Sequence, residues 1–274
     1  MINYNGNLQP YTTVALTSDN RAFKYGDGVF ETLKIVNSKI IFFEEHYFRL
    51  MASMRMIRME IPMDFTQENL EKEIIKTANA QGLIDSSRVR LTVFRKDGGK
   101  YFPLTNEIDY VIEVTELIVK PKSEYIVDLF KDHYVHSGIL STIKSTNRIL
   151  NVVSSIYATE NELDSCILLN EKKQIVEVIH GNIFLVKGTE IITPSITEGC
   201  IKGVIRNKLI QILKKNPTYS TVEREISPFE LQKADELFIT NSIIDIQSVT
   251  NYRKKIYKTE IGEEMRALLK KEYV

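Results

Sequence analysis

The sequence has no excess charge, few cysteines and no long apolar run, and each absence excludes a class of protein. Lys plus Arg and Asp plus Glu both number 36, so the formal net charge is zero. A neutral chain lacks the positive field that attracts nucleic acid or an anionic membrane. The two cysteines, Cys166 and Cys200, are too few for a disulfide framework and match no clustered metal spacing. We therefore expect no nucleic-acid, membrane or metal partner, and a reducing cytoplasm as the location.

The N-terminal stretch MINYNGNLQPYTTV has no basic region followed by an apolar one, so no secretory leader is expected. No apolar run approaches the roughly 20 residues that span a bilayer. What the chain does have is length: 274 residues, 43% of them hydrophobic, are enough for one large domain or two ordinary ones. The sequence thus predicts a soluble, intracellular, globular protein.

The first part of the chain shows both strand and helix patterns. Residues 29–43, VFETLKIVNSKIIFF, predict a hairpin that turns at Asn37-Ser38. A helix is expected from Glu44, where apolar residues recur at helical spacing. These apolar residues are Tyr47, Leu50, Met51 and Met54. Two further strands are expected over 86–95 and 109–117, with KDGGKYFP as a loop after the first.

The polar stretch 119–125, VKPKSEY, has little pattern, and we predict a linker there between domains 1–118 and 126–274. In the second domain we expect a helix over 145–162 with a five-residue apolar face, and a capping box over 227–230. The helix face comprises Ile149, Val152, Val153, Ile156 and Tyr157. A strand is expected over 125–130, hairpins over 166–179 and 182–194, a strand ending in a polar turn over 235–249, and a helix within 199–215. Because strands and helices mix without strict alternation, the sequence predicts an α+β fold with mostly antiparallel sheet.

Two stretches of the first domain could carry chemistry. In YGDGVFETL, Gly26 and Gly28 flank Asp27, which indicates a turn with positive φ or a close backbone approach. A plain tight turn explains them equally well. In EEHYFRL, Arg49 adjoins the apolar face of its helix. It is either a snorkelling side chain or a fixed cation suited to phosphate.

Three stretches of the second domain also stand out. STIKSTNRIL places Lys144 among hydroxyl and amide residues. In IVEVIHGNIF, the strand alternation puts Glu177 on an apolar face, where a carboxylate needs a partner. That partner is either a structural arginine or a cationic ring nitrogen. In CIKGVIRN, Gly203 precedes a helix whose first N–H groups, on Val204 and Ile205, could point at an anion or simply begin a helix.

In this order, these stretches resemble the fold-type IV pyridoxal-phosphate enzymes, the class-IV aminotransferases. The resemblance runs through RAFKYGDGVFETLKI, FFEEHYFRL, IKSTNRIL, IVEVIHGNIFLV, ITPSITEGCIKGVIRNKLI and ADELFITNS, which together extend over nearly the whole chain. The family includes branched-chain and D-amino-acid aminotransferases and aminodeoxychorismate lyase. The resemblance implies a two-domain α+β fold, a homodimer, pyridoxal 5'-phosphate as cofactor, and small amino acids and 2-oxo acids as partners. The cofactor would lie in a cleft between the domains.

The resemblance also assigns roles to individual residues. It implies that Lys144, in the larger C-terminal domain, forms the Schiff base with the cofactor and that Glu177 faces the pyridine nitrogen. It places Tyr25 in the active site, facing the substrate. For the cofactor phosphate it implies four ligands: Arg49, the backbone N–H groups of Val204 and Ile205, and Ser242.

These roles agree with elementary chemistry. A lysine must be neutral to attack a carbonyl, and burial beside a cationic ring lowers the lysine pKa toward that state. An anion at Glu177 would keep the ring nitrogen protonated, which suits a ring that must store carbanion electrons. Lys144 could then move the proton at substrate Cα.

The sequence departs from the family pattern at two positions. His180 stands where small residues are common and is expected to fill space, while Ile205 replaces a frequent threonine. The cation for the substrate carboxylate is expected at Lys100, with Arg90 and Arg95 as rivals. A solvent-facing charge is the plain alternative for each, and it is our expectation for Arg95.

Three functions follow from the resemblance. The first is transamination between an amino acid, branched-chain or D-amino-acid-like, and a 2-oxo acid. The second is an aminodeoxychorismate lyase that produces 4-aminobenzoate and pyruvate. The third is a non-catalytic protein that binds pyridoxal phosphate. Retention of both Lys144 and Glu177 favours the enzymes, because storage needs the lysine but not the carboxylate.

Overall fold

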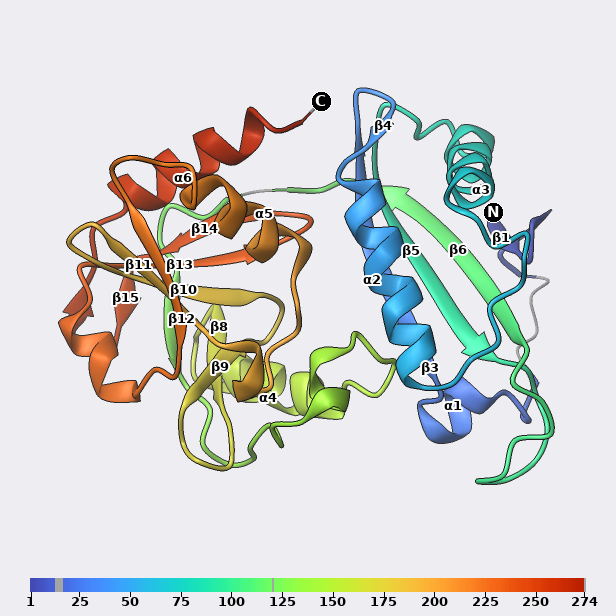
Figure 1. Cartoon of the computed structure of the whole chain (residues 1–274), viewed down its shortest axis with the longest axis horizontal. Coiled ribbons are helices and arrows are strands. Elements are labelled where there is room, and N and C mark those ends of the chain that lie inside the picture. Colours follow the sequence, from blue (N-terminus) through green and yellow to red (C-terminus); the bar gives the residue numbers. More distant parts are fainter. Residues whose placement is uncertain (13–16, 120, 274) are drawn as a thin grey trace. The chain divides into compact units, whose positions relative to one another are not determined.

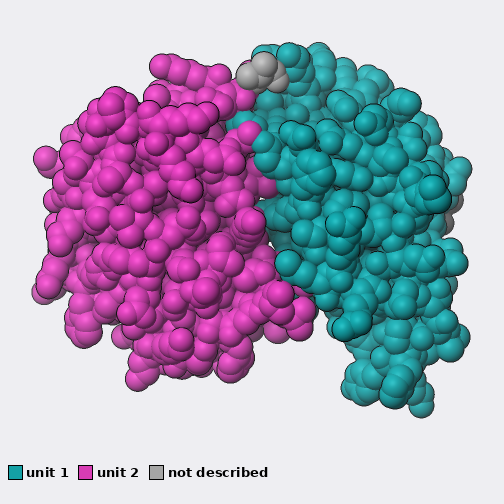
Figure 2. Space-filling model, in the orientation of Figure 1, with its two compact units in different colours: residues 1–118, 144–147 teal, residues 119–143, 148–274 magenta. Residues whose placement is uncertain are grey.

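A computed structural model describes residues 1–12, 17–119 and 121–273, which form two compact units (Figure 2). Unit 1 comprises Met1–Ile118 and Lys144–Asn147, and unit 2 comprises Val119–Ile143 and Arg148–Val274. The chain therefore crosses from one unit to the other three times.

Unit 1 is built on a six-stranded antiparallel sheet in the order β2-β1-β6-β5-β3-β4 (Figure 1). The long central strands β3, β5 and β6 are pinned in register by continuous pairing from Gly28↔Phe94 to Val36↔Ser86 and from Ser87↔Glu116 to Arg95↔Ile108. The bounds are β1 Ile2–Tyr4, β2 Asn7–Gln9, β3 Gly28–Val36, β4 Lys39–Ile40, β5 Ser86–Arg95 and β6 Ile108–Glu116.

Two helices, α2 (Phe43–Met56) and α3 (Gln67–Ala80), cover one face of this sheet. The strand register puts Glu31, Leu91, Ile112 and Asn3 in one row, since each is paired with the next. Glu31 bonds to α2 and Asn3 bonds to α3 through Thr77, so both helices lie on this face. The opposite face carries partly buried polar residues, among them Thr32, Arg90 and Thr92. A short helix, α1 (Arg21–Tyr25), precedes β3.

The segment Lys144–Asn147 is counted with unit 1, whereas the sequence analysis placed Lys144 in the C-terminal domain. Backbone hydrogen bonds explain the difference. The Phe30 N–H donates to the Lys144 carbonyl at 2.8 Å, and the Thr146 N–H donates to the Gly28 carbonyl at 2.9 Å. The lysine is thus held along the start of β3, although the segments on both sides of residues 144–147 belong to unit 2.

Unit 2 contains two five-stranded sheets, β12-β11-β10-β13-β14 and β16-β15-β7-β8-β9. Three pairings, β11-β12, β15-β7 and β7-β8, are parallel, and the others within these sheets are antiparallel. The strand bounds are β7 Ile126–Leu129, β8 Ser165–Leu169, β9 Ile175–Val178, β10 Asn182–Lys187, β11 Glu190–Pro194, β12 Ser220–Arg224, β13 Glu236–Asn241, β14 Asp245–Val249, β15 Asn251–Tyr252 and β16 Lys255–Ile256. The helices are α4 Ile149–Glu160, α5 Val204–Leu213 and α6 Glu260–Lys270, and short 3-10 turns cover Ile139–Thr142, Ile196–Glu198 and Pro228–Lys233.

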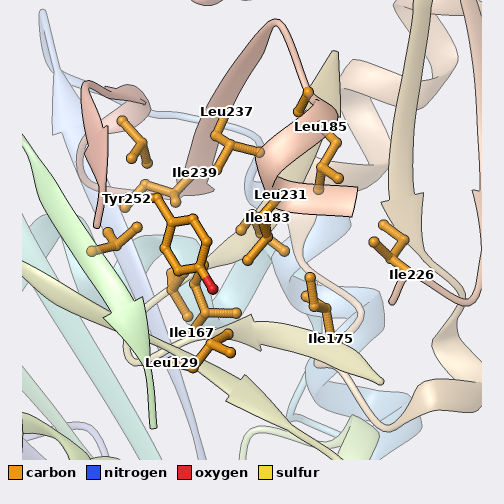
Figure 3. Close-up of a cluster of buried hydrophobic side chains, with 14 of the residues drawn as sticks. Leu129, Ile167, Ile175, Ile183, Leu185, Ile226, Leu231, Leu237, Ile239 and Tyr252 are labelled. Carbon is orange, nitrogen blue, oxygen red and sulfur yellow. The ribbon is translucent and has the colours of Figure 1, made fainter. Parts of the chain in front are cut away.

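The core of unit 2 draws on both of its sheets (Figure 3). Ile167 and Ile175 come from one sheet, and Ile183, Leu237 and Ile239 come from the other. All five are fully buried, so removing any one to alanine would cost about 2–5 kcal/mol. This core fixes β9 and β10, which carry residues of the candidate site.

Several predicted elements are confirmed, including the α+β class. The hairpin turns at Asn37 and Ser38, both with positive φ, and β5 spans the predicted 86–95. Ser227 caps the turn that begins at Pro228, and Glu230 reaches back to the Ser227 N–H at 3.1 Å. Helix α2 begins at Phe43, one residue before the predicted start.

The prediction for 145–162 is wrong in its start and in most of its apolar face. Helix α4 begins only at Ile149, because the preceding residues pair with β3 instead. Ile149, Val152 and Ile156 are at least half exposed in unit 2. The helix is buried through Ser154 and Ala158, with Leu150, Val153 and Tyr157 packed against the same small cluster.

The residues described here include no helix with the combined length and apolar character that a membrane span requires.

Candidate functional site

In unit 1, Lys144 and Arg90 share a contact, the ring of Phe30. Lys144 Nζ is 4.5 Å from the ring centroid, and Arg90 Cζ is 3.8 Å from it. Phe30 is on β3 and Arg90 on β5, two neighbouring strands of the same sheet, so the sheet register sets this spacing. The structure therefore brings together the proposed covalent lysine and one candidate cation for a substrate carboxylate.

Arg90 is a partly buried cation with a weak counter-ion. Its Nε donates to Thr92 Oγ1 at 3.2 Å, and Glu113 Oε2 lies 4.0 Å away. Burial lowers the pKa of Arg90 from its ordinary value, Glu113 opposes that change, and the neighbouring Arg88 charge adds to it. An arginine remains charged despite such a shift. A cation in this setting gains by binding an added anion.

Arg49 projects from α2 toward β3, where Glu31 holds it. Arg49 Nε donates to Glu31 Oε1 at 2.7 Å, and Nη2 donates to Oε2. His46 Nδ1 lies 2.7 Å from the same Oε2. Of these three residues, only Arg49 was predicted from the sequence as a site residue. Burial alone would raise the pKa of Glu31, but Arg49 and His46 outweigh it and lower that pKa to about 2.

The depressed pKa of Glu31 predicts a pH-dependent stability. A carboxyl with a folded-state pKa near 2 and an ordinary value of 4.5 stabilises the fold fully above pH 4.5. That contribution is lost as pH falls from about 4.5 through 2. We expect Glu31→Gln to lose this dependence, which amounts to about 3 kcal/mol in the wild type. Urea unfolding at several pH values measures it; an unchanged difference between the two proteins across this window would contradict the assigned pKa.

Asp27 organises a second buried cluster, between the two glycines of YGDG. Asp27 Oδ2 accepts from Arg21 Nε at 2.8 Å and from Arg95 Nε at 2.9 Å. Gly26 has a φ of 65°, and a Cβ on Gly28 would approach the Val93 carbonyl at 3.1 Å. Gly26 thus adopts a positive φ and Gly28 lies in a close backbone approach, the two conformations that the sequence indicated. The expectation of a solvent-facing Arg95 is wrong: Arg95 is 6% exposed and also donates to Asn106 and to the Ile57 carbonyl.

The same cluster sets the loop that carries Lys100. Arg21 Nη1 donates to the carbonyls of Gly98 and Lys100, at 3.0 and 2.7 Å. The Arg21 guanidinium also lies over the Tyr25 ring, 5.1 Å from its centroid, and Tyr25 contacts Tyr101. Lys100 itself is exposed. Arg21 thus holds the backbone of this loop, and Tyr101 of the loop contacts Tyr25 of α1, but the Lys100 side chain is exposed to solvent.

In unit 2, Glu177 is a buried carboxylate on β9, 6% exposed. Its Oε2 accepts the Ile201 N–H at 3.0 Å. Burial, and then the Glu177 charge, raise the pKa of the nearby Cys200 thiol to about 12. The thiol is therefore protonated and unreactive at neutral pH. Glu177 supplies the main negative charge that acts on this thiol.

The start of α5 lies beside Glu177 because one loop contacts both. Ile201 bonds Glu177 through its N–H and Asn182 through its carbonyl, at 2.8 Å. Gly203 precedes the helix, and a Cβ there would meet Asn182 Oδ1 at 2.1 Å, so a larger residue would displace the Asn182 side chain. Val204 and Ile205 are the first helical residues, whose N–H groups have no partner within the helix.

Ser242 lies in the turn between β13 and β14, and this turn is linked to the same region. Asn182 on β10 is paired with Thr240 on β13, two residues before Ser242. Asn241 Oδ1 accepts the N–H groups of Ile243 and Ile244, which fixes the turn. Among the described residues, Thr240 Oγ1 is buried and has no hydrogen-bond partner. Glu177, the start of α5 and the Ser242 turn thus form one connected group in unit 2.

His180 is exposed, and its Nε2 lies 3.1 Å from the hydroxyl of the buried Tyr125. The expectation that His180 fills space is not what the structure shows, because an exposed ring fills no interior volume. Its contact ties the β9–β10 turn to Tyr125, which precedes β7.

The family model described as amino-transferase class IV matches residues 28–252. The chain is 26% identical to a D-alanine aminotransferase of Bacillus licheniformis, over 90% of this chain and 87% of that protein. It is 23% identical to an aminodeoxychorismate lyase of Vibrio harveyi, over 88% of each chain. The solved structure of a branched-chain aminotransferase from the thermophilic archaeon Thermoproteus uzoniensis, with norvaline, is similar with a TM-score of 0.89. That pair is 22% identical, and the match covers 98% of this chain and 95% of the other.

Proposed function

Because the chain belongs to the class IV aminotransferase family, we propose that it is a transaminase that moves an amino group between an amino acid and a 2-oxo acid. The family depends on pyridoxal 5'-phosphate. The observation that carries the proposal is the arrangement of Lys144 and Arg90 around Phe30. It sets a nucleophilic amine close to a cation that can hold the carboxylate of an amino acid.

The residues present fit this cofactor. In unit 2, a buried carboxylate, a helix start and a hydroxyl turn are joined by Asn182, and Thr240 Oγ1 is a buried hydroxyl without a partner among the described residues. In unit 1, Arg49 offers a guanidinium already held by Glu31. Taken unit by unit, the buried carboxylate of unit 2 suits a cationic ring nitrogen, and the helix start of unit 2 and the guanidinium of unit 1 each suit a phosphate.

When bound, pyridoxal phosphate supplies an aldehyde carbon and a ring that stabilises negative charge at substrate Cα. Lys144 would provide the amine for covalent attachment and, once the substrate amine has displaced it, would hold or move the Cα proton at Nζ. Glu177 would keep the ring nitrogen protonated. The phosphate would be held by Arg49, by the N–H groups of Val204 and Ile205, and by the Ser242 hydroxyl.

We assign the substrate carboxylate to Arg90 first and to Lys100 second, with Tyr25 facing the substrate. Arg90 lies next to the lysine contact and has a weak counter-ion, whereas Lys100 extends into solvent. The planar fork of Arg90 also matches a carboxylate better than an ammonium does.

Arg90→Gln is therefore expected to raise KM for the amino acid by about 30-fold or more, with a smaller change in kcat. The lost charge-assisted hydrogen bonds to the carboxylate are the cause. Lys100→Gln should change KM by less than about threefold. Steady-state kinetics with the best amino donor measure both variants; a larger effect at Lys100 would reverse the assignment.

The lyase is a second candidate, favoured by the similarity to the Vibrio harveyi enzyme. One assay separates the two. The protein is incubated with aminodeoxychorismate and no 2-oxo acid, and pyruvate and 4-aminobenzoate are measured. Release of both would establish the lyase and overturn the transaminase. Amino-group transfer from a branched-chain or D-amino acid to a 2-oxo acid, with no pyruvate released, would support the transaminase.

A protein that binds the cofactor without turnover would fail both assays. The visible absorbance of the holoprotein would then stay unchanged when amino acids are added.

The proposal also includes a homodimer and a cytoplasmic location. The exposed apolar residues of α4 support a partner surface, and light scattering should give twice the chain mass of 31.6 kDa.

A further inference from the structure

The Glu31–His46–Arg49 cluster is built more elaborately than a phosphate-binding arginine alone requires. Glu31 is 2% exposed and His46 1%, and both are linked to the more accessible Arg49 side chain at 12%. His46 and Arg49 are three residues apart on α2, which puts both on the helix face that meets β3. One carboxylate therefore fixes two side chains of one helix.

The protonation states in the cluster follow from the contacts. Glu31 stays ionised, so its oxygens only accept, and His46 Nδ1 at 2.7 Å must carry the proton. Burial lowers the pKa of His46, against the opposing effect of Glu31, so the ring is neutral at physiological pH. His46 thus adds a donor without adding charge. The carboxylate is held in one plane by donors on both of its oxygens.

The geometry of the ion pair determines which edge of the Arg49 guanidinium faces Glu31. Nε and Nη2 both face Glu31, so the carboxylate takes the side edge of the planar guanidinium. An anion that binds as well must take the end edge, formed by Nη1 and the second N–H of Nη2. An arginine fixed in this way has already lost its rotamer freedom, so a phosphate binds without that entropic cost.

We propose that Glu31 and His46 are positioning residues that orient the Arg49 guanidinium for the cofactor phosphate. The proposal rests on the proposed function, since it needs Arg49 to bind that phosphate. Glu31 sets the guanidinium plane, and His46 holds Glu31. Neither residue touches the cofactor.

The test compares two ligands that differ only in the phosphate. Apoprotein is titrated with pyridoxal 5'-phosphate and with pyridoxal, and the ratio of the two dissociation constants is the readout. Glu31→Gln and His46→Leu are each expected to reduce the preference for the phosphorylated ligand by about tenfold. His46→Asn keeps an N–H donor at the position of Nδ1, so it should stay within about twofold of the wild type. A residue with a merely structural role would weaken both ligands alike.

Two further variants make the result decisive. Arg49→Gln gives the ratio of dissociation constants that remains without the guanidinium. Adding Glu31→Gln to it should reduce the preference for the phosphorylated ligand no further. Asp27→Asn disturbs the other buried carboxylate–arginine cluster of unit 1 and should leave the preference unchanged. Equal weakening of both ligands by His46→Leu, or a loss in His46→Asn as large as in His46→Leu, would overturn the positioning roles. Failure of the wild type to bind either ligand would instead overturn the proposed function, and the positioning proposal with it.

Discussion

Lys144→Ala is expected to abolish turnover, with a loss of about 10⁴-fold or more, while the protein still folds. The side chain is partly exposed, and the segment is held to β3 by backbone hydrogen bonds that alanine retains. Removing the amine takes away both the covalent attachment point and the group that moves the Cα proton. Assays of amino-group transfer measure the turnover, and circular dichroism checks the fold.

A second measurement locates the attachment point. The wild-type holoprotein is reduced with borohydride, digested and analysed by mass spectrometry, and the pyridoxyl mass should appear on the peptide with Lys144. Lys215→Ala removes an exposed lysine at the end of α5 and should change neither the label nor the rate. A labelled residue other than Lys144, or full turnover in Lys144→Ala, would refute the assignment.

The elements that could be predicted from the sequence are those whose signals lie within a few neighbouring residues. The turn at Asn37-Ser38 joins two apolar runs, and the capping box of Ser227 and Glu230 spans four residues. Such signals need no knowledge of the rest of the chain. The helix α3 was not predicted, although its threonine cap and its buried Leu70 and Ile74 follow the same rules. The α+β class and the family resemblance are both confirmed.

Helix α4 shows where local patterns fail. Its sequence has apolar residues around much of its circumference, so periodicity cannot tell which side is buried. Tertiary packing makes that choice, and it buries Ser154 and Ala158 because small residues allow α4 to lie close to β8. The start of the helix was misplaced for a similar reason. Backbone pairing of Ser145 with Val29 holds that segment extended, and these residues are far apart in the sequence.

The candidate site was partly accessible from the sequence. The argument that selected Glu177, a carboxylate within an apolar strand, applies equally to Glu31 in VFETL. Glu31 could therefore have been found by the same rule. Arg95 could not, because its partner Asp27 is 68 residues away and nothing local shows that its strand end turns inward. Likewise, the position of Phe30 beside both Arg90 and Lys144 could be recognised only once the register of β3 and β5 was known.

The two buried carboxylates hold different partners, and this difference separates their proposed roles. Glu31 is paired with a protein cation and neutralises it. Glu177 accepts a backbone N–H from Ile201, and that bond orients one oxygen but brings no full positive charge. A cation stabilises a buried carboxylate, and in the proposed function the protonated ring nitrogen is a cation that Glu177 would face.

Glu177→Gln is therefore expected to lower kcat by at least about 100-fold and to affect cofactor binding much less. Glutamine keeps the shape and can still accept the Ile201 N–H, so β9 and the start of α5 should stay in place. It cannot hold a proton on the ring nitrogen electrostatically, so the ring would stabilise charge at Cα poorly. The absorbance titration gives the cofactor affinity, and single-turnover mixing with an amino acid gives the rate.

Glu223→Gln, which removes a carboxylate paired with Arg206 elsewhere in unit 2, is the matched control and should leave the rate unchanged. A wild-type rate in Glu177→Gln would mean that the carboxylate only supports the Ile201 loop. The proposed role of Glu177 in keeping the ring nitrogen protonated would then be wrong.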